Sequence, residues 1–520
     1  MKIDTQHLPD DAAELKKLVT KLIAETEKKV TELTVENKSL KQDIDYYKEQ
    51  LNLTRQKTFA ASSEKSDNKA QKPLFNEAED LVSKQKDLKV PKKTKSKLKN
   101  KIPKREPIDP ALDRDETVYD IKTQDKTCCG KTMQPMGEVS SEQIDIIPAK
   151  VIIKKHTRLK YVCDCCKTIK TSTMPKQPIP KSLASPRLLA TLATNKYSDG
   201  LPLYRQESVL ARHGIHLKRS TTASWMIKVS ELLQPLFNLM QDDLLTRPVL
   251  QADETPIQVL KEPGRKATSK SWMWVLASGK YNIGPPIILF YYDISRSASV
   301  PMKLLDGWSG HLMIDGYKGY DFVIEKQDIK ACACLDHVRR KFHDAIKAKA
   351  KDSEPSLSDE FLDLIGQLYA VEKELKDLNA DSRLQARIEK SQPILDKIRQ
   401  KLDCHLEHIR PKSLLGQAMQ YLDKQWSRLL RVLESGSIPI SNELCENAIR
   451  PFALGRKNWI FSASQSGANA SSLIYSIIET AKANGHEPFH YLNHVLEHLP
   501  NCESAEDFDK LLPYNLKLNS

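Results

Sequence analysis

The chain has 520 residues and a formal net charge of +13, with 81 Lys and Arg residues against 68 Asp and Glu residues. This length allows several domains, and the positive surplus favours an anionic partner, with nucleic acid first and an anionic membrane surface second. No apolar run approaches the roughly 18 residues of a membrane span, and the charged N-terminus has no signal-peptide core. These features argue against secreted and membrane-spanning classes, and we expect a soluble cytoplasmic protein without a membrane partner.

Residues 12–58 contain neither Gly nor Pro and are predicted to form one long helix. Seven residues occupy the a and d positions of a heptad: Val30, Leu33, Asn37, Leu40, Ile44, Tyr47 and Leu51. This pattern predicts a coiled coil that joins two chains, with Asn37 at an a position fixing the register. The earlier residues Leu15, Leu18 and Leu22 fit the heptad poorly, so an amphipathic helix packed on its own domain stays an alternative.

Residues 59–112 are polar and rich in lysine, most densely at residues 92–101. Such a composition buries too little apolar surface to fold, so we expect a basic disordered linker. Its simplest role is a solvated tether. Its charge would also suit a non-specific contact with DNA phosphates, whose affinity falls with salt.

Residues 113–180 are predicted to form a small zinc-ribbon-like module. Four of its cysteines are the candidate zinc ligands: Cys128, Cys129, Cys163 and Cys166. Four thiolates would close a tetrahedral Zn²⁺ site, and the second pair has the usual C-x-x-C spacing. The first pair is adjacent, which is unusual, so a ribbon without zinc, held by strands at 143–148 and 151–153, is the alternative.

Residues 185–240 are predicted to form a helix-turn-helix. A first helix ends near His213 and Gly214, and a second helix begins within residues 220–225, where a Ser or Thr is expected to cap it. The basic residues that would contact the DNA backbone are Arg205, Arg212, Lys218 and Arg219. An ordinary helical hairpin of the core would give a similar pattern, so the pattern alone does not decide.

Residues 247–344 are rich in strands, with apolar runs at 249–255, 272–276, 287–291, 312–314 and 329–335. Asp253 and Asp315 each end such a run, which places a carboxylate on or just past a strand. Buried acids are costly unless they bind something, and convergent carboxylates favour hard divalent cations. The sequence therefore predicts a metal-dependent site for phosphoryl transfer.

The last of these strands carries Cys332 and Cys334, whose alternation predicts burial rather than metal binding. His337, Arg339 and Arg340 follow, and would contact DNA or help to hold the acidic site. A lone histidine is also often structural.

Residues 345–437 have apolar residues at helical spacing throughout, which predicts a helical insertion between two parts of the site. In residues 438–500, Ser441 or Asn442 is expected to cap a helix that carries Glu446 and Arg450 on one face, where they would form at least a surface ion pair. A final helical pair and a tail at 501–520 complete the chain.

Several motifs in this order resemble the transposases of the insertion sequence 66 family. They are Ala252-Asp253-Glu254-Thr255, Asp315-Gly316-Tyr317-Lys318-Gly319-Tyr320, Cys334-Leu335-Asp336-His337-Val338-Arg339-Arg340-Lys341-Phe342, Asn442-Glu443-Leu444-Cys445-Glu446, and Gly455-Arg456-Lys457-Asn458-Trp459. Residues 62–65, 196–206 and 478–485 look like the same family. The resemblance runs from about residue 15 to residue 500.

The resemblance implies a mixed α/β fold with a ribonuclease H-like catalytic core, and a triad of Asp253, Asp315 and Glu446 that holds Mg²⁺ or Mn²⁺. Residue chemistry alone leaves Glu443 and Glu479 open as the third acid, and the place of Glu446 in the motif selects it. Basic residues would neutralise DNA phosphates near the triad: His337, Arg339, Arg340, Arg450, Arg456 and Lys457. The chain departs from the family at Cys128-Cys129, which replaces a full C-x-x-C, and at Asn447, where the family usually has Arg.

The function implied is that of a DNA transposase, which binds the terminal inverted repeats of its element and catalyses metal-dependent strand cleavage and strand transfer. Its partners would be transposon-end and target DNA, a second copy of the chain in a dimer or larger synaptic assembly, and small accessory proteins of the same element. It would act in the cytoplasm at the bacterial nucleoid. The alternatives are an inactive DNA-binding remnant and a structure-specific nuclease without strand transfer.

Overall fold

The computed structural model describes residues 11–59, 127–128, 131–132, 150–162, 169–279, 281, 284–321, 325, 328–348 and 356–518. The chain forms two units, one of residues 1–59 and 155–520 and the other of residues 60–154. Apart from Phe59, the predicted linker lies outside the described residues. In the described part of the chain, no helix combines the length and the apolarity that crossing a membrane requires.

The predicted N-terminal helix is present as α1 (Ala12–Phe59), which runs for 48 residues. Heptad residues such as Val30, Leu33 and Leu40 expose 51–61% of their surface in the single chain. An apolar seam of this kind suits a second helix along it, and the coiled coil stays a prediction.

A mixed sheet carries the acidic motifs. Its strands are β5 (Val249–Lys261), β6 (Lys270–Ser278), β7 (Ile287–Asp293), β8 (Gly310–Ile314), β9 (Ile329–Ala333) and β10 (Ser462–Ser464). The order is β7-β6-β5-β8-β9, and β10 pairs with the far half of β5. The β5, β6 and β7 strands are antiparallel, whereas β8 and β9 run parallel to β5. The expected strands are confirmed, and β5 is longer than expected.

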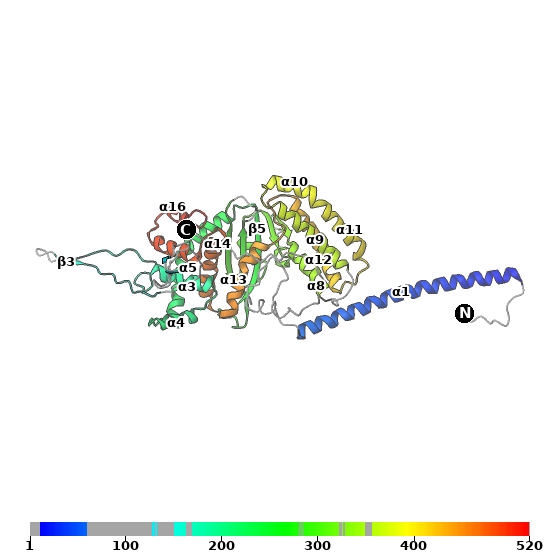
Figure 1. Cartoon of the computed structure of the whole chain (residues 1–520), viewed down its shortest axis with the longest axis horizontal. Helices are drawn as coiled ribbons and strands as arrows, with labels where there is room; N and C mark the ends of the chain where they lie inside the picture. The colour runs from blue at the N-terminus through cyan, green and yellow to red at the C-terminus, as the bar shows by residue number, and fades with distance from the viewer. Residues whose placement is uncertain are drawn as a thin grey trace. The chain divides into compact units, whose positions relative to one another are not determined.

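Helices α5 (Arg219–Leu244), α13 (Glu443–Trp459) and α14 (Gln465–Ala483) pack against this sheet (Figure 1). Further helices outside the insertion are α3 (Pro186–Tyr197), α4 (Leu203–Arg212), α6 (Ser299–Leu304), η2 (Lys318–Tyr320), α15 (Pro488–His498), η4 (Leu499–Asn501) and α16 (Ala505–Asp509). Edge strand β7 is covered by α14, because Ser476 and Thr480 accept hydrogen bonds from the backbone of Phe290 and Ile288. These hydroxyls satisfy groups that an open edge would expose.

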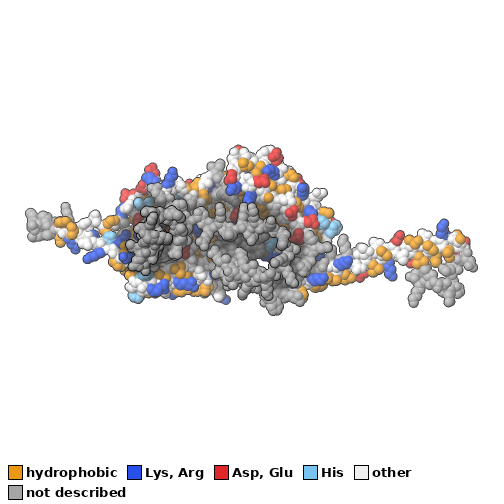
Figure 2. Space-filling model, in the orientation of Figure 1, with side chains coloured by type: hydrophobic (Ala, Val, Ile, Leu, Met, Phe, Trp, Pro, Cys, Tyr) orange, Lys and Arg blue, Asp and Glu red, His pale blue; other side chains and the backbone are white. Residues whose placement is uncertain are grey.

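The predicted helix-turn-helix corresponds to α4, a turn at residues 213–218 and α5. The expected Ser or Thr cap is wrong: Lys218, which has an extended backbone, is the N-cap residue and makes no side-chain cap bond, so the helix begins at Arg219, before the first serine. Beyond its exposed first turn, α5 is a core helix that buries Trp225, Met226 and Val229. Lys and Arg side chains gather along the lower edge of the molecule in Figure 2, where Figure 1 places α4.

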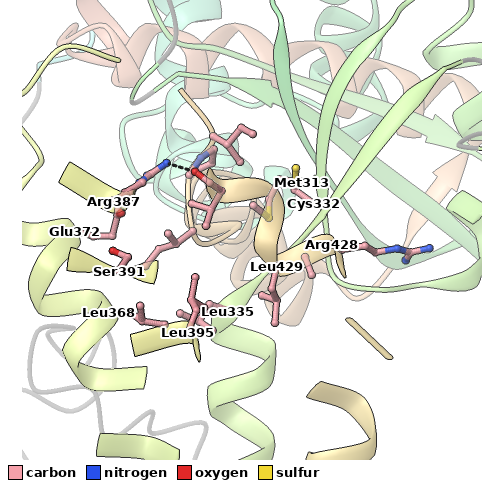
Figure 3. Close-up of a pocket in the computed structure, with 15 residues that line it drawn as sticks. Met313, Cys332, Leu335, Leu368, Glu372, Arg387, Ser391, Leu395, Arg428 and Leu429 are labelled. Carbon is pink, nitrogen blue, oxygen red and sulfur yellow. Dashed lines mark hydrogen bonds and ion pairs between the residues drawn. The ribbon is translucent and has the colours of Figure 1, made fainter. Parts of the chain in front are cut away.

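The predicted helical insertion is present as a bundle with its own apolar core. Residues 345–437 contain α9 (Leu357–Glu374), α10 (Ala380–Lys390), α11 (Gln392–Leu406), α12 (Leu414–Leu430) and η3 (Arg431–Leu433). The bundle begins before residue 345, because α8 (Leu335–Lys347) buries Val338 and Phe342 in the same core. A cavity of about 30 Å³ lies where the bundle meets the sheet, lined by Met313 and Cys332 of the sheet and by the ion pair of Glu372 and Arg387 (Figure 3).

Two short hairpins precede the helices, β1 (Thr127–Cys128) with β2 (Lys131–Thr132), and β3 (Lys160–Val162) with β4 (Ile169–Thr171). The strand expected at residues 151–153 is wrong, because these residues are exposed and pair with no strand. The strand expected at 143–148 lies outside the described residues.

Candidate carboxylate site at the centre of the sheet

Asp253 and Asp315 lie on neighbouring parallel strands at the same level. Asp253 lies on the central strand β5, and Asp315 follows the last residue of β8. The ladder between these strands pairs Gln251 with Met313. Continuing that register by two residues sets Asp253 opposite Asp315, so the two predicted acids converge.

The turn after β8 is held in place by its own residues. Gly316 has a φ of +88°, which side-chain-bearing residues rarely adopt, and a Cβ there would lie 3.0 Å from the amide nitrogen of Gln425. The Tyr317 backbone N–H donates to Asp315 Oδ1 at 2.9 Å, and the Tyr421 hydroxyl donates to the Asp315 carbonyl at 2.6 Å. These contacts fix both the carboxylate and the backbone of Asp315.

Glu446 comes from α13, the first helix after the insertion. Asn442 precedes this helix and is fully buried. Its Nδ2 donates to the Ala252 carbonyl at 2.8 Å, and its backbone N–H donates to Cys334 Sγ at 3.2 Å. Asn442 is the N-cap residue, but its side chain makes no cap bond because it reaches across to β5. The start of α13 is therefore fastened beside Asp253, and Glu446 follows one turn later.

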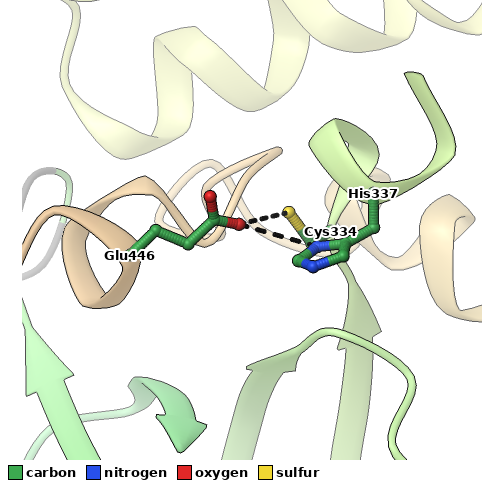
Figure 4. A group of neighbouring side chains, drawn as sticks. All are labelled: Cys334, His337 and Glu446. Atoms are coloured by element: carbon green, nitrogen blue, oxygen red, sulfur yellow. Dashed lines mark hydrogen bonds and ion pairs between the residues drawn. The ribbon is translucent and has the colours of Figure 1, made fainter. Parts of the chain in front are cut away.

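The Glu446 carboxylate faces residues of β9 and α8 (Figure 4). Its oxygens lie 3.6 Å from His337 Nδ1, 3.5 Å from Arg340 Nη2 and 4.0 Å from Cys334 Sγ. Among the described residues, the group of at least three metal-ligand atoms that all lie within 4.8 Å of one another is Cys334, His337 and Glu446. In this conformation Glu446 is therefore grouped with Cys334 and His337, and not with the two aspartates.

Burial and mutual repulsion control the protonation of these acids. Burial, then the negative charge of Glu254, raises the pKa of Asp253 to about 8, and Asp315 and Glu446 add to the rise. Burial also raises the pKa of Glu446, partly offset by the charges of Arg340 and Arg450. Among the described residues, the charged groups that shift the pKa of Asp253 most are the acids Glu254, Asp315 and Glu446, and each of them disfavours its carboxylate form.

Glu254, the residue next to Asp253, differs from it in having a cationic partner. Glu254 is buried, and its Oε1 lies 2.5 Å from Arg296 Nη2 while its Oε2 accepts from the Tyr320 hydroxyl at 3.0 Å. Arg296 also lies over the Tyr317 ring, 3.8 Å from its centroid. The sequence analysis missed this network. Its signal was present, because Tyr317 and Tyr320 belong to the motif that begins at Asp315.

The burial predicted for Cys332 and Cys334 is confirmed, since each exposes 1% of its surface. Burial raises the pKa of each thiol to about 12. Cys334 nevertheless lies beside Glu446, a contact that the sequence did not predict. His337 is close to the acidic site as one reading expected, and burial and the charge of Arg340 lower its pKa.

The basic residues predicted to contact DNA occupy several different places. Arg340 and Arg450 act on Glu446 electrostatically, as described above. Arg456 of α13 donates to the Pro256 carbonyl on β5, so it also ties its helix to the sheet. Arg339 lies over the Tyr369 ring, 5.9 Å from its centroid. The predicted DNA-contact residues of α4, its turn and α5 are all exposed: Arg205, Arg212, Lys218 and Arg219. Lys457 is exposed near the end of α13.

The side chains of the candidate zinc ligands lie outside the described part of the chain. Cys129, Cys163 and Cys166 lie outside the described residues, and Cys128 is described only as part of the backbone of β1. The strands that flank them form the two hairpins described above.

Comparisons with known proteins identify four matching family models. Residues 181–470 match the transposase IS66 family, and residues 476–514 match the IS66 C-terminal element. Residues 127–167 match the zinc-finger binding domain of transposase IS66, and residues 46–117 match the model described as transposase C of IS166 homeodomain. The last match covers the whole of the segment, residues 59–112, that composition predicts to be a linker.

Three similar proteins come from Sinorhizobium fredii (strain NBRC 101917 / NGR234), and each is named as an uncharacterized protein. The protein y4qI is 30% identical over 75% of this chain and 73% of its own length. The proteins y4jD and y4hP are 28% and 27% identical, over 78% and 80% of this chain and 81% and 78% of their own lengths.

Proposed function

The chain belongs to the transposase IS66 family, and from this premise we propose that it cleaves transposon ends and joins them to target DNA. The proposed catalytic acids are Asp253, Asp315 and Glu446. The observation that carries the proposal is the buried Asp253, set opposite Asp315 and surrounded by other acids. Such an arrangement is costly in a folded protein unless a cation compensates it.

The donor atoms suit a hard divalent cation. Carboxylate oxygens are the ligands that Mg²⁺ and Mn²⁺ prefer, and all three acids supply only oxygen. When bound, such an ion lowers the pKa of water and stabilises a leaving oxygen of a phosphodiester. Asp253 and Asp315 are held for this role by their strands, whereas Glu446 must turn from its present partners to join them.

We propose that the sheet and its helices form a ribonuclease H-like core. The support is a three-stranded antiparallel unit extended by two parallel strands, with acids at the centre of the sheet and a third acid on a helix that follows the insertion. In the reaction, water would attack the phosphodiester at the transposon end, and the freed 3′ hydroxyl would then attack the target strand. Nearby Arg339, Arg340, Arg450 and Lys457 would offset phosphate charge.

DNA is the partner that the family and its zinc-finger model support. We propose that the exposed basic residues of α4 and the first turn of α5 contact the terminal repeats, and that the cysteine module binds structural zinc. The exposed heptad seam of α1 supports a dimer, which would hold two ends together. We also propose that small accessory proteins of the same element take part in the reaction.

The test is cleavage of a labelled transposon-end duplex by the purified protein in Mg²⁺ or Mn²⁺, with DNA binding measured in parallel. We expect Asp253→Ala and Glu446→Gln to bind the duplex but to lose cleavage by at least about 10³-fold. Glu443→Gln is the matched control, because this exposed acid lies in the first turn of the same helix, and it should still cleave.

The outcomes separate the alternatives. Equal loss of binding and cleavage in Asp253→Ala would count against a metal-holding role. Cleavage by Glu446→Gln would mean that the third acid lies elsewhere. Wild-type protein that binds without cleaving would favour a remnant or a missing accessory protein, and cleavage without joined products would favour a nuclease.

A further inference from the structure

Glu446 has a second set of neighbours that the proposed reaction does not use. Cys334 directly follows β9 and is the N-cap residue of α8, and His337 lies in the first turn of α8. One ligand atom from each of Cys334, His337 and Glu446 lies within 4.8 Å of the others, as Figure 4 shows. A sulfur, an imidazole nitrogen and a carboxylate oxygen thus converge on one point.

We infer that Cys334, His337 and Glu446 form a binding site for a thiophilic divalent cation such as Zn²⁺, distinct from the proposed magnesium site but sharing Glu446 with it. Thiolate and imidazole ligands select zinc-like cations, whereas all-oxygen sites select magnesium-like ones. Three protein ligands leave the fourth tetrahedral position for water.

The distances fit a small adjustment around a cation. Bonds of about 2.0–2.3 Å in a tetrahedral zinc site place ligand atoms about 3.3–3.8 Å apart. Glu446 Oε1 lies 3.6 Å from His337 Nδ1 and 4.0 Å from Cys334 Sγ. The remaining contact on this carboxylate is Arg340, whose side chain is 58% exposed and so has room to move away.

The surroundings hold the ligands in this arrangement. The Asn442 N–H donates to Cys334 Sγ at 3.2 Å, which helps to fix the position of the sulfur. His337 Nδ1 is buried and has no hydrogen-bond partner in the structure. A buried, unsatisfied nitrogen is costly, and a cation there would satisfy it.

The consequence for activity rests on the proposed function. A cation held by Cys334 and His337 would fix Glu446 through Oε1 beside α8, and it would compete with the two aspartates for this carboxylate. A thiophilic cation would therefore withdraw the third acid and inhibit cleavage, even when Mg²⁺ is abundant.

The first experiment measures binding by the full chain, without DNA. Protein stripped of metal is dialysed against Zn²⁺, and the zinc bound per chain is counted for wild type, Cys334→Ser, His337→Gln and Cys332→Ser. The last is the matched control, since Cys332 lies on β9 two residues before Cys334, is equally buried and is not in the cluster.

We expect Cys334→Ser and His337→Gln to bind one zinc ion fewer than wild type, and Cys332→Ser to bind the same number. Equal numbers in all four proteins would overturn the site. Thermal unfolding reports whether each variant folds. If Cys334→Ser does not fold, the more accessible His337→Gln decides the matter, and Co²⁺ in place of Zn²⁺ shows in its spectrum whether a thiolate ligand is lost in the variants.

The second experiment measures inhibition of cleavage by Zn²⁺ at fixed Mg²⁺, relative to the activity of each variant without zinc. Half-inhibition of Cys334→Ser should require at least about tenfold more zinc than wild type, as expected on loss of a ligand, and Cys332→Ser should match wild type. Equal sensitivity would overturn the inhibitory role. If no protein cleaves DNA, the proposed function fails, and the binding experiment still decides the site.

Discussion

Buried acids occur in two contrasting settings in this protein. In the insertion, Glu372 accepts two bonds from Arg387, at 2.6 and 2.8 Å, and Arg387 also donates to the carbonyls of Val432 and Ser435. At the centre of the sheet, Asp253 accepts a hydrogen bond from the backbone N–H of Glu254, and burial together with the charges of neighbouring acids raises its pKa to about 8. The first acid is satisfied by the fold, whereas the second is left for something that the fold does not supply.

The same contrast recurs between adjacent residues of β5. Successive side chains of a strand point to opposite faces of the sheet. Glu254 contacts Arg296 and Tyr320 on one face of the sheet. Asp253 points to the other face, with Asp315 opposite it in the strand register and Glu446 near enough to raise its pKa. One strand thus carries a structural ion pair and a candidate reactive acid side by side, and only their partners tell them apart.

The largest expected effect comes from breaking the satisfied pair. Arg387 is completely buried, so Arg387→Met leaves Glu372 without its partner and should lower the free energy of unfolding by about 3–5 kcal/mol. Urea unfolding followed by circular dichroism measures it. Lys390→Met is the control, because Lys390 pairs with Glu374 on the same two helices at 50% and 64% exposure, and it should cost under about 1 kcal/mol. Similar losses in both variants would refute the difference between buried and exposed pairs.

The next effect separates the two neighbours on β5. Glu254→Gln weakens the pair with Arg296, which is 37% exposed, and should cost about 1–3 kcal/mol of unfolding free energy. Asp253→Asn removes a buried charge that has no cationic partner, and should be neutral or stabilising without divalent cations. Unfolding of both variants in EDTA near pH 8 tests this. A large destabilisation by Asp253→Asn would mean that Asp253 has a structural partner after all.

Local patterns in the sequence were enough to predict most elements of the fold. The strands around Trp274 and Phe290 and the helices of the insertion follow directly from apolar periodicity. Strand β5 was predicted too short because Pro256 normally ends or weakens a strand. It is tolerated here because β8 pairs only with Val249–Gln251, which leaves that side of β5 without a β8 partner at Pro256.

The candidate site was predictable only in part. Asp253 and Asp315 end apolar runs, so local chemistry indicated them, but Glu446 was selected by the family motif. The contacts of Glu446 with Cys334 and His337 join segments more than 100 residues apart, as the 112 residues between Cys334 and Glu446 illustrate. Side-chain pairs brought together by the insertion, such as Glu372 with Arg387, have no local signal either.

A smaller effect concerns the pH dependence of stability in metal-free protein. The pKa of Asp253 is raised from 3.8 to about 8 on folding, so between these values the folded state holds a proton that the unfolded state has lost. This contribution to stability is complete below about pH 4 and is lost as the pH rises to about 8. Wild type should therefore lose stability relative to Asp253→Asn across this range, measured by urea midpoints in EDTA. Added Mg²⁺ should reduce the loss, and parallel curves without metal would show that Asp253 is not buried in this way.

The smallest expected effect is a gain in stability where α13 ends. Ile460 has a φ of +65°, which is strained for a β-branched residue, and its side chain is 63% exposed, so little burial is lost on its removal. Ile460→Gly keeps the backbone bond from residue 460 to the Arg456 carbonyl and should raise the free energy of unfolding by about 1 kcal/mol. Phe461→Gly is the control, because residue 461 has no positive φ and glycine there should destabilise. A loss of stability in both variants would show that the conformation of Ile460 carries no strain. The helix that carries Glu446 would then end without backbone strain.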